Sequence, residues 1–142
     1  MKYQTFSDSV QETYPVAFLA PKLDREAMSR EYLDPGAISP EDVIAYEILK
    51  TGKKTPIVTI KEYLDDLMDM LGDLGTKYVV VGDGEYFKAL TGVQKTDAYL
   101  GYVLPNTYPE NMAGQFNVLY CPNYRQVFYN PGVVKTKIKQ TL

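Results

Sequence analysis

The sequence predicts an α/β protein in which a central, mostly parallel sheet of four strands lies between two layers of helices, a three-layer α/β/α arrangement. Apolar runs at residues 16–20, 78–81 and 116–120 have the length of buried strands, and helical patterns lie between them. The length of 142 residues suits one domain with one core. We therefore expect residues 1–142 to form a single unit.

The N-terminal part is expected to hold the first strand and two helices. Val16-Ala17-Phe18-Leu19-Ala20 lies between prolines, which is typical of a strand buried on both faces. Residues 1–14 are expected to be a flexible or peripheral arm. A short helix is expected around residues 24–32. Ser39-Pro40-Glu41-Asp42 has the composition of a helix start, which predicts a second helix through Leu49.

The most regular pattern follows in the middle of the chain. Thr59-Ile60-Lys61-Glu62 matches a capping box, and apolar residues then recur at helical spacing up to Leu74. Aspartates between the apolar positions predict a solvated acidic face, because a metal site would need ligands from other segments as well.

The C-terminal half predicts three more strands. Tyr78-Val79-Val80-Val81 is followed by Gly82-Asp83-Gly84, which leads into a short helix over residues 85–90 that ends at Gly92. Residues 101–104 and 116–120 are the third and fourth strands, and Asn130 caps a last helix. Because a doubly wound sheet binds ligands beyond the carboxyl ends of its strands, a site is expected after these four strands. The positions concerned are Ala20-Pro21, Gly82-Asp83, Leu104-Pro105 and Cys121-Pro122.

Missing residue types exclude several classes of enzyme. The chain has no histidine, which removes Ser-His and Cys-His nucleophilic pairs and the commonest transition-metal ligand. Cys121 is the only cysteine, so a reducing, cytoplasmic setting is expected, and no metal or cofactor is predicted. No Walker-type GK[ST] motif and no run of roughly 20 apolar residues is present, which argues against ATP hydrolysis of that kind and against a membrane span.

Three groups of residues are candidates for a site. Asp83 and Glu85 follow a strand and are possible site acids, although helix capping is the favoured explanation for them. Cys121 is expected to line a crevice passively, because no histidine is there to activate it. The net charge of −3 counts against a broad basic surface, so any DNA contact must be local. Residues that could combine phosphate contacts with base stacking on a single strand are Lys50, Lys53, Lys54, Tyr124, Arg125 and Tyr129.

The C-terminal half also resembles a known family. The segment YVVVGDGEYFKALTG resembles the strand, glycine turn and helix of the uracil-DNA glycosylase superfamily, and LGYVLP resembles the strand that follows. FNVLYCPNYRQVFYNP is similar to the final strand and catalytic loop, and VAFLAP to the first strand. The resemblance implies a glycosylase-like fold. Divergent domains of this kind occur at the N-terminus of bacteriophage family A DNA polymerases. Lys135 to Lys139 contain no residue that signals the end of the last predicted helix, so the chain is expected to continue.

Two departures from the family pattern bear on function. Active members place an acidic residue or asparagine at the first motif and a histidine at the second. This chain has Ala20-Pro21 and Cys121-Pro122-Asn123 there, and neither alanine nor a thiol can form the same hydrogen bonds. The resemblance therefore implies an inactive homologue that takes part in phage DNA replication in the host cytoplasm. Such a domain would contact DNA weakly, including single-stranded DNA, or dock a polymerase body or a replication accessory protein.

Two alternatives remain open. The chain could be an active DNA glycosylase that uses Asp83, Glu85 or Asp34 in place of the usual groups. It could also be a stand-alone protein-interaction module of the flavodoxin-like kind with no nucleic-acid role. Release of uracil from DNA and salt-dependent DNA binding distinguish these alternatives.

Overall fold

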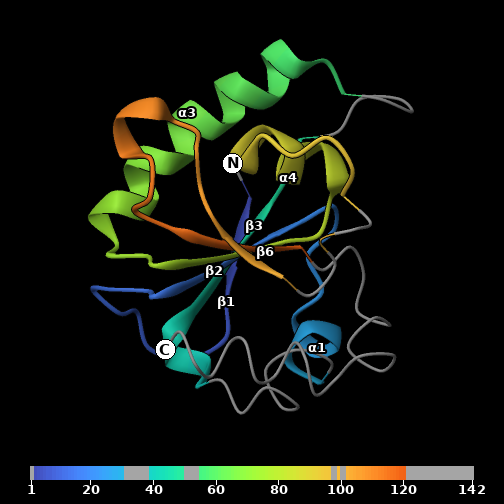
Figure 1. Cartoon of the computed structure of the whole chain (residues 1–142). Helices are drawn as coiled ribbons and strands as arrows, with labels where there is room; N and C mark the ends of the chain where they lie inside the picture. The colour runs from blue at the N-terminus through green and yellow to red at the C-terminus, as the bar shows by residue number, and fades with distance from the viewer. Residues whose placement is uncertain (1, 31–38, 50–54, 97–98, 100–101, 121–142) are drawn as a thin grey trace.

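The computed structural model describes residues 2–30, 39–49, 55–96, 99 and 102–120 (Figure 1). These residues form a mixed α/β fold. Its elements in chain order are β1 (Tyr3–Thr5), β2 (Val16–Ala20), α1 (Arg25–Met28), the 3-10 turn η2 (Pro40–Asp42), β3 (Val43–Glu47), α3 (Ile57–Asp73), β4 (Tyr78–Val81), α4 (Gly84–Thr91), β5 (Val103–Pro105), the 3-10 turn η4 (Glu110–Met112) and β6 (Asn117–Tyr120).

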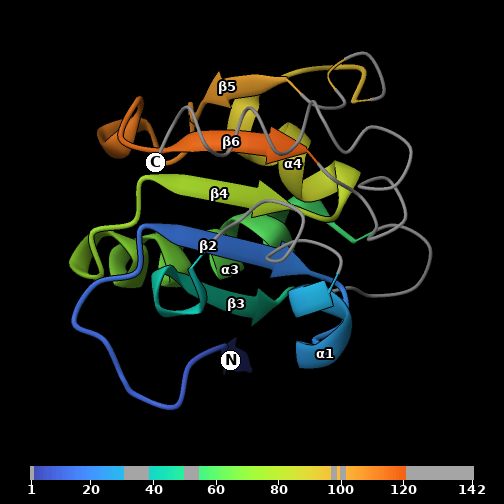
Figure 2. The ribbon, with the colours of Figure 1, turned by 90° about the horizontal axis from the view of Figure 1, so that it is seen from below.

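A six-stranded sheet in the order β1-β3-β2-β4-β6-β5 forms the centre of the described structure. The four inner strands are parallel, whereas β1 and β5 pair antiparallel at the two edges. Figure 2 shows this directly, because the arrows of β3, β2, β4 and β6 point one way and that of β5 points the other. The inner strands therefore place their carboxyl ends along one edge of the sheet, called the carboxyl edge below.

The chain reverses its winding direction between β2 and β4. It passes from β2 to β3 on one side and then returns to place β4 on the other side of β2. In open α/β sheets, such a reversal separates the loops that follow the two strands and is the usual place for a ligand crevice. The loops after Ala20 and Val81 are the ones concerned.

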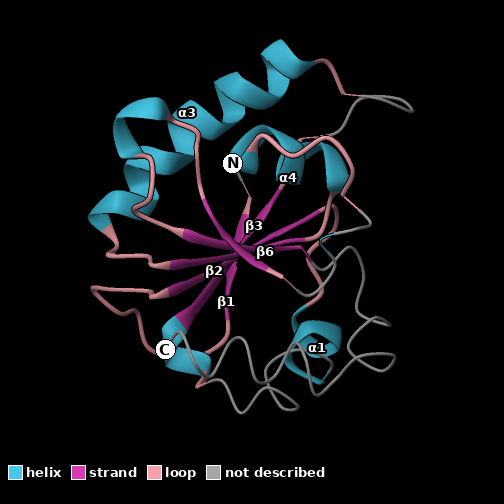
Figure 3. Cartoon of the chain, viewed as in Figure 1, coloured by secondary structure: helices cyan, strands magenta, loops and turns pink. Residues whose placement is uncertain are grey.

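The two faces of the sheet are covered differently. Helices α3 and α4 lie together over one face, and α1 lies over the other (Figures 1 and 3). Under α1, Met28 and Phe6 pack with the side chains of β2, β3 and β4 that point to that face. The N-terminal arm thus contributes an edge strand and buried side chains to the fold, among them Phe6 and Tyr14.

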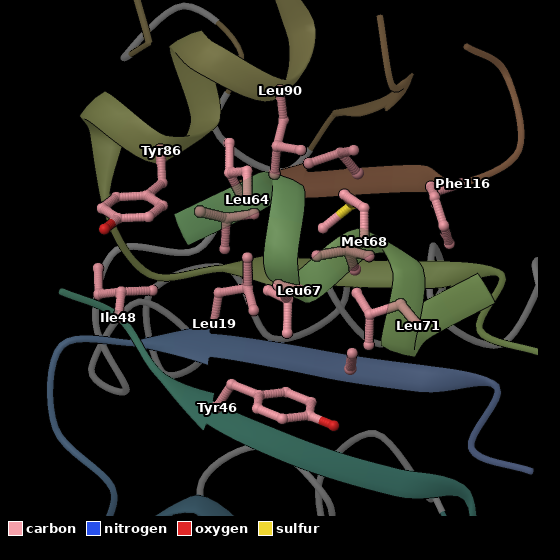
Figure 4. Packing of buried hydrophobic residues seen from close by; sticks show 14 of the residues in the cluster. Leu19, Tyr46, Ile48, Leu64, Leu67, Met68, Leu71, Tyr86, Leu90 and Phe116 are labelled. Atoms are coloured by element: carbon pink, nitrogen blue, oxygen red, sulfur yellow. The ribbon is translucent and has the colours of Figure 1, made fainter. Parts of the chain in front are cut away.

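Helix α3 supplies most of the larger core. Its side chains Leu64, Leu67 and Leu71 are fully buried and point down onto the sheet, where Leu19 of β2 meets them (Figure 4). Burying a leucine stabilises a fold by roughly 1.5–3 kcal/mol. This row of leucines at helical spacing therefore fixes α3 across the sheet, and with it the position of the chain on both sides of the helix.

The predicted helix over residues 39–49 is wrong. Pro40–Asp42 form a single 3-10 turn, and Val43–Glu47 then run as β3, paired in parallel with β2 from Val16↔Val43 to Ala20↔Glu47. Val43 to Tyr46 are all buried, because both faces of this inner strand are covered. The helix-start composition before the strand produces only the turn.

Three further expectations need correction. The sheet has six strands instead of four. Because β5 is antiparallel, Leu104-Pro105 lies at the edge opposite the carboxyl ends of the inner strands. The capping box at Thr59 does not start a helix, since α3 already begins at Ile57 after Pro56, and no side-chain cap bond is present there.

The other strands and the short helix agree with the sequence prediction. Strands β2 and β4 match residues 16–20 and 78–81, and β6 occupies four of the five residues expected at 116–120. Helix α4 ends at Gly92, whose φ of 76° is the left-handed conformation expected of a glycine cap. The helix predicted after Asn130 lies outside the described residues.

Candidate functional site

The carboxyl edge at the winding reversal is closed by backbone contact. The Gly82 amide donates a hydrogen bond of 2.7 Å to the Leu19 carbonyl, which carries the pairing of β2 and β4 one residue past β4. A Cβ on Gly82 would lie 3.2 Å from the Leu19 carbonyl oxygen and 3.3 Å from Cδ of Pro21. Ala20 ends β2 beside this contact and is buried. The first motif position therefore presents a methyl group with no hydrogen-bonding atom.

Asp83 caps helix α4. Its backbone is extended, with φ of −138°, and its Oδ2 accepts a hydrogen bond of 3.1 Å from the Tyr86 amide. The side chain is buried. A carboxylate in this position satisfies an amide at the helix start and complements the helix dipole. The structure thus places one of the two possible site acids in a helix cap.

Glu85 and Tyr86 hold the chain on both sides of residues 50–54. Glu85 Oε2 accepts a hydrogen bond of 2.9 Å from the amide of the buried Thr55. The Tyr86 hydroxyl donates a hydrogen bond of 2.5 Å to the Leu49 carbonyl. Both residues belong to the first turn of α4, so the described residues before and after 50–54 are fixed at the carboxyl edge.

A second tyrosine strengthens the same attachment. The Tyr63 hydroxyl donates a hydrogen bond of 2.7 Å to the Glu47 carbonyl at the end of β3, and its ring meets that of Tyr86 edge-on at 5.7 Å. Burial raises the pKa of Tyr86 to about 12 and raises the pKa of Tyr63 as well. Both phenols therefore stay protonated near neutral pH and serve as hydrogen-bond donors, not as general bases.

Strand β6 reaches the same edge close to the start of α4. The ring of Tyr120, its last residue, stacks on Phe87 with centroids 5.1 Å apart. A Cβ on Gly84 would lie 3.3 Å from the Tyr120 hydroxyl oxygen, so this strand end and the helix start are closely packed. Tyr120 therefore ends β6 at the carboxyl edge, where Leu49 also lies.

The candidates from the sequence divide into two sets. Ala20, Pro21, Asp83 and Glu85 are described, and the structure brings all four to the carboxyl edge around the winding reversal. The remaining candidates lie outside the described residues, and they are Asp34, Lys50, Lys53, Lys54, Cys121, Pro122, Asn123, Tyr124, Arg125 and Tyr129.

Sequence reasoning missed the contacts that organise this edge. Thr55 and Glu85 are 30 positions apart, and Leu49 and Tyr86 are 37 apart. No local pattern connects them, because the pairing arises only when α3 carries the chain back over the sheet. A signal was present only for Asp83, which stands at a strand-to-helix turn.

The described residues offer no cluster of ligands for a metal ion. No three side chains of aspartate, glutamate or cysteine come close enough together in this part of the chain to hold one. Likewise, none of the helices found among these residues is long and apolar enough to cross a lipid bilayer. The acids of the carboxyl edge are instead used in hydrogen bonds to backbone amides.

Comparison with known proteins adds no relative. A scan against models of protein families finds no match, and a search of curated proteins finds no significant one.

Proposed function

We propose that this chain is a catalytically inactive, uracil-DNA glycosylase-like domain that contacts DNA at its carboxyl edge, as part of a phage DNA replication polymerase. One observation carries the DNA contact. Leu49 and Thr55, which flank the lysine-containing segment 50–54, are both tied to the first turn of α4. The described residues on either side of the three lysines are therefore held where a ligand of this fold class would lie.

The lack of catalysis follows from the side chains at the edge. Ala20 offers no group to position water, and Asp83 and Glu85 each accept a hydrogen bond from a backbone amide of the fold. An acid that caps a helix or anchors a loop cannot move to a substrate without loss of that bond. Removal of one catalytic electrostatic group typically costs about 10² to 10³ in rate. An intact glycosylase mechanism thus has no described residue to carry it.

The second support is that β6 ends at the same edge. Residues after Tyr120 include Tyr124 and Arg125, and Arg with Tyr is the combination that holds single-stranded DNA by charge and stacking. Because β3 and β6 are parallel to the strands between them, both strands end at the carboxyl edge. The proposal therefore places the local basic groups of an acidic protein on one side of the molecule.

Binding of fluorescein-labelled, uracil-containing single-stranded DNA tests the proposal. We expect weak binding, with an association constant whose logarithm falls linearly as the logarithm of the salt concentration rises. The size of this slope should be about 0.7 for each phosphate neutralised. The double variant Lys53→Gln/Lys54→Gln should reduce that slope by about 1.4. Fluorescence anisotropy at several salt concentrations measures the slope for each protein. After incubation the same DNA is treated with alkali, which should reveal no abasic sites.

A matched pair of lysines provides the control. Lys77 precedes β4 at the opposite edge of the sheet, and Lys88 lies in the last turn of α4, which points away from the carboxyl edge. Lys77→Gln/Lys88→Gln removes the same charge and should leave the slope unchanged. An equal loss in both variants, or no binding at low salt, would contradict the DNA contact and favour an interaction module. Alkali-labile sites in the DNA would favour an active enzyme with non-standard residues.

A further inference from the structure

An exposed tyrosine lies at the carboxyl edge beside the end of β6. Tyr102 directly precedes β5, and the next residue, Val103, pairs with Leu119 of β6. Because β5 and β6 are antiparallel, Tyr102 lies next to Tyr120, the residue at which β6 ends. In Figure 2, β5 accordingly begins on the side to which the arrow of β6 points. The start of β5 therefore adds a side chain to the carboxyl edge.

Two backbone hydrogen bonds position Tyr102. Its amide donates a hydrogen bond of 2.9 Å to the Tyr99 carbonyl, and the Tyr99 amide donates one of 2.9 Å to the Thr96 carbonyl. Thr96 lies close to the start of α4, because an added Cβ on Gly84 would lie 3.4 Å from the Thr96 Oγ1. The rings of Tyr99 and Tyr102 meet edge-on, with centroids 6.4 Å apart and an angle of 77° between their planes. The fold thus fixes Tyr102 near the first turn of α4.

The ring of Tyr102 is open to solvent. The residue is 58% exposed, whereas Tyr99 is partly buried and packs against the larger core. An edge-on contact covers at most one face of a ring, so Tyr99 leaves a face of the Tyr102 ring uncovered. Proteins that bind single-stranded nucleic acid stack bases on aromatic side chains of this kind. Tyr102 therefore has the position and the exposure that stacking requires.

A lysine lies close to this pair of tyrosines. Lys95 is exposed, and it lines a hollow of about 540 Å³ together with residues 91–94 and Tyr99. Among the described residues that line this hollow, Lys95 is charged and none is acidic, whereas Asp66 and Asp73 each line a hollow elsewhere. No carboxylate of the described residues forms an ion pair with Lys95. The surface next to the exposed ring is therefore locally basic in an acidic protein.

We propose that Tyr102 stacks on a base of single-stranded DNA and that Lys95 contacts a phosphate of the same strand. This inference rests on the proposed DNA contact at the carboxyl edge, and it names described residues that hold the strand there. Base faces within a duplex are covered by their neighbours, so stacking on Tyr102 requires a single strand. A ring for the base and a cation for the backbone are the two groups that such binding combines.

Two fluorescein-labelled strands of equal length and charge test the stacking. One is oligothymidylate, and the other has abasic spacers in place of its nucleosides. Fluorescence anisotropy of the full chain with each strand at low salt measures the two dissociation constants. We expect oligothymidylate to bind at least about fivefold more tightly than the abasic strand. Tyr102→Ala should weaken binding of oligothymidylate at least about fivefold and leave binding of the abasic strand unchanged, whereas Tyr102→Phe should retain both affinities.

Matched variants control for exposure and for charge. Tyr3 is 63% exposed and packs on Tyr46 at 6.2 Å, but it lies on β1, the edge strand farthest from β5. Tyr3→Ala should therefore leave both affinities unchanged. Lys95→Gln should reduce the salt slope by about 0.7 on both strands, whereas Lys77→Gln, before β4 at the opposite edge, should not. Circular dichroism checks that Tyr102→Ala is folded.

The outcomes separate this inference from the proposed function. Equal binding of the two strands by the unmodified chain overturns the stacking, and so does equal weakening by Tyr102→Ala and Tyr3→Ala. In either case a salt slope that depends on Lys53 and Lys54 leaves the DNA contact itself standing. An unmodified chain that binds neither strand at low salt overturns both proposals.

Discussion

At position 82 the surrounding atoms of Leu19 and Pro21 require a glycine. Its missing side chain lets β4 approach the end of β2, where an added Cβ would lie 3.2 Å from the Leu19 carbonyl oxygen and 3.3 Å from Cδ of Pro21. Neither neighbour is the free end of a flexible side chain. We expect Gly82→Ala to lower the free energy of unfolding by about 1–3 kcal/mol through overpacking. Urea unfolding followed by circular dichroism measures the change.

Gly72 provides a control of opposite sign. It lies near the end of α3 and is exposed, and an added Cβ there would meet only the terminal methyl of Met112 at 3.4 Å. Alanine in a helix is favoured over glycine by roughly 0.8–1 kcal/mol. Gly72→Ala should therefore raise the free energy of unfolding by up to about 1 kcal/mol. If both substitutions destabilise the chain to the same extent, the close approach of β2 and β4 is not what requires glycine at position 82.

At the scale of elements, the start of α4 depends on its cap. Asp83→Ala removes the acceptor of the Tyr86 amide and should lower the free energy of unfolding by about 0.5–2 kcal/mol. Asp83→Asn keeps a side-chain oxygen in place, so it should recover most of that loss. Thermal unfolding of the two variants compares them. Equal damage by asparagine and alanine would mean that the negative charge matters more than the hydrogen bond.

The segment from Ser39 to Glu47 shows where local sequence is insufficient. Ser39-Pro40-Glu41-Asp42 has the composition of a helix start, and the turn at Pro40–Asp42 does form. The helix stops there because Val43 to Tyr46 are β-branched, small or aromatic and find a partner in β2, which is already buried on its other side by β4. Pairing with a strand more than 20 residues earlier outweighs the helix signal, and such pairing is not visible in a local pattern.

Across the whole molecule, the sequence predicted three of the four inner strands and missed β3. Strands β2, β4 and β6 are short apolar runs that any parallel sheet would bury, so composition alone identifies them. The edge strands contain only three residues each: β5 overlaps the strand predicted at residues 101–104 but runs antiparallel, and β1 carries no comparable signal. For the site, the Asp83 cap follows from its place at a turn. The anchoring of Leu49 and Thr55 depends on long-range contacts and could not be predicted.

The lack of histidine and the thirteen tyrosines together predict how stability depends on pH. Histidine is the side chain whose ordinary pKa causes a change of charge between about pH 5 and 8. We therefore expect the free energy of unfolding to change by less than about 0.5 kcal/mol between pH 6 and 8. Urea unfolding at these pH values and at pH 10 and 11 provides the profile.

Above pH 10 the free energy of unfolding should fall, because buried tyrosines lose their protons less readily in the folded state than in the unfolded state. Burial raises the pKa of Tyr86 to about 12, whereas the unfolded chain releases this proton at about pH 10. The folded state then binds more protons than the unfolded state, so the stabilisation is complete below pH 10 and is lost as pH rises toward 12. The slope is at most about 1.4 kcal/mol per pH unit for each such tyrosine. Tyr86→Phe should make this decline shallower, while Tyr102→Phe, at a tyrosine that is 58% exposed, should leave it unchanged.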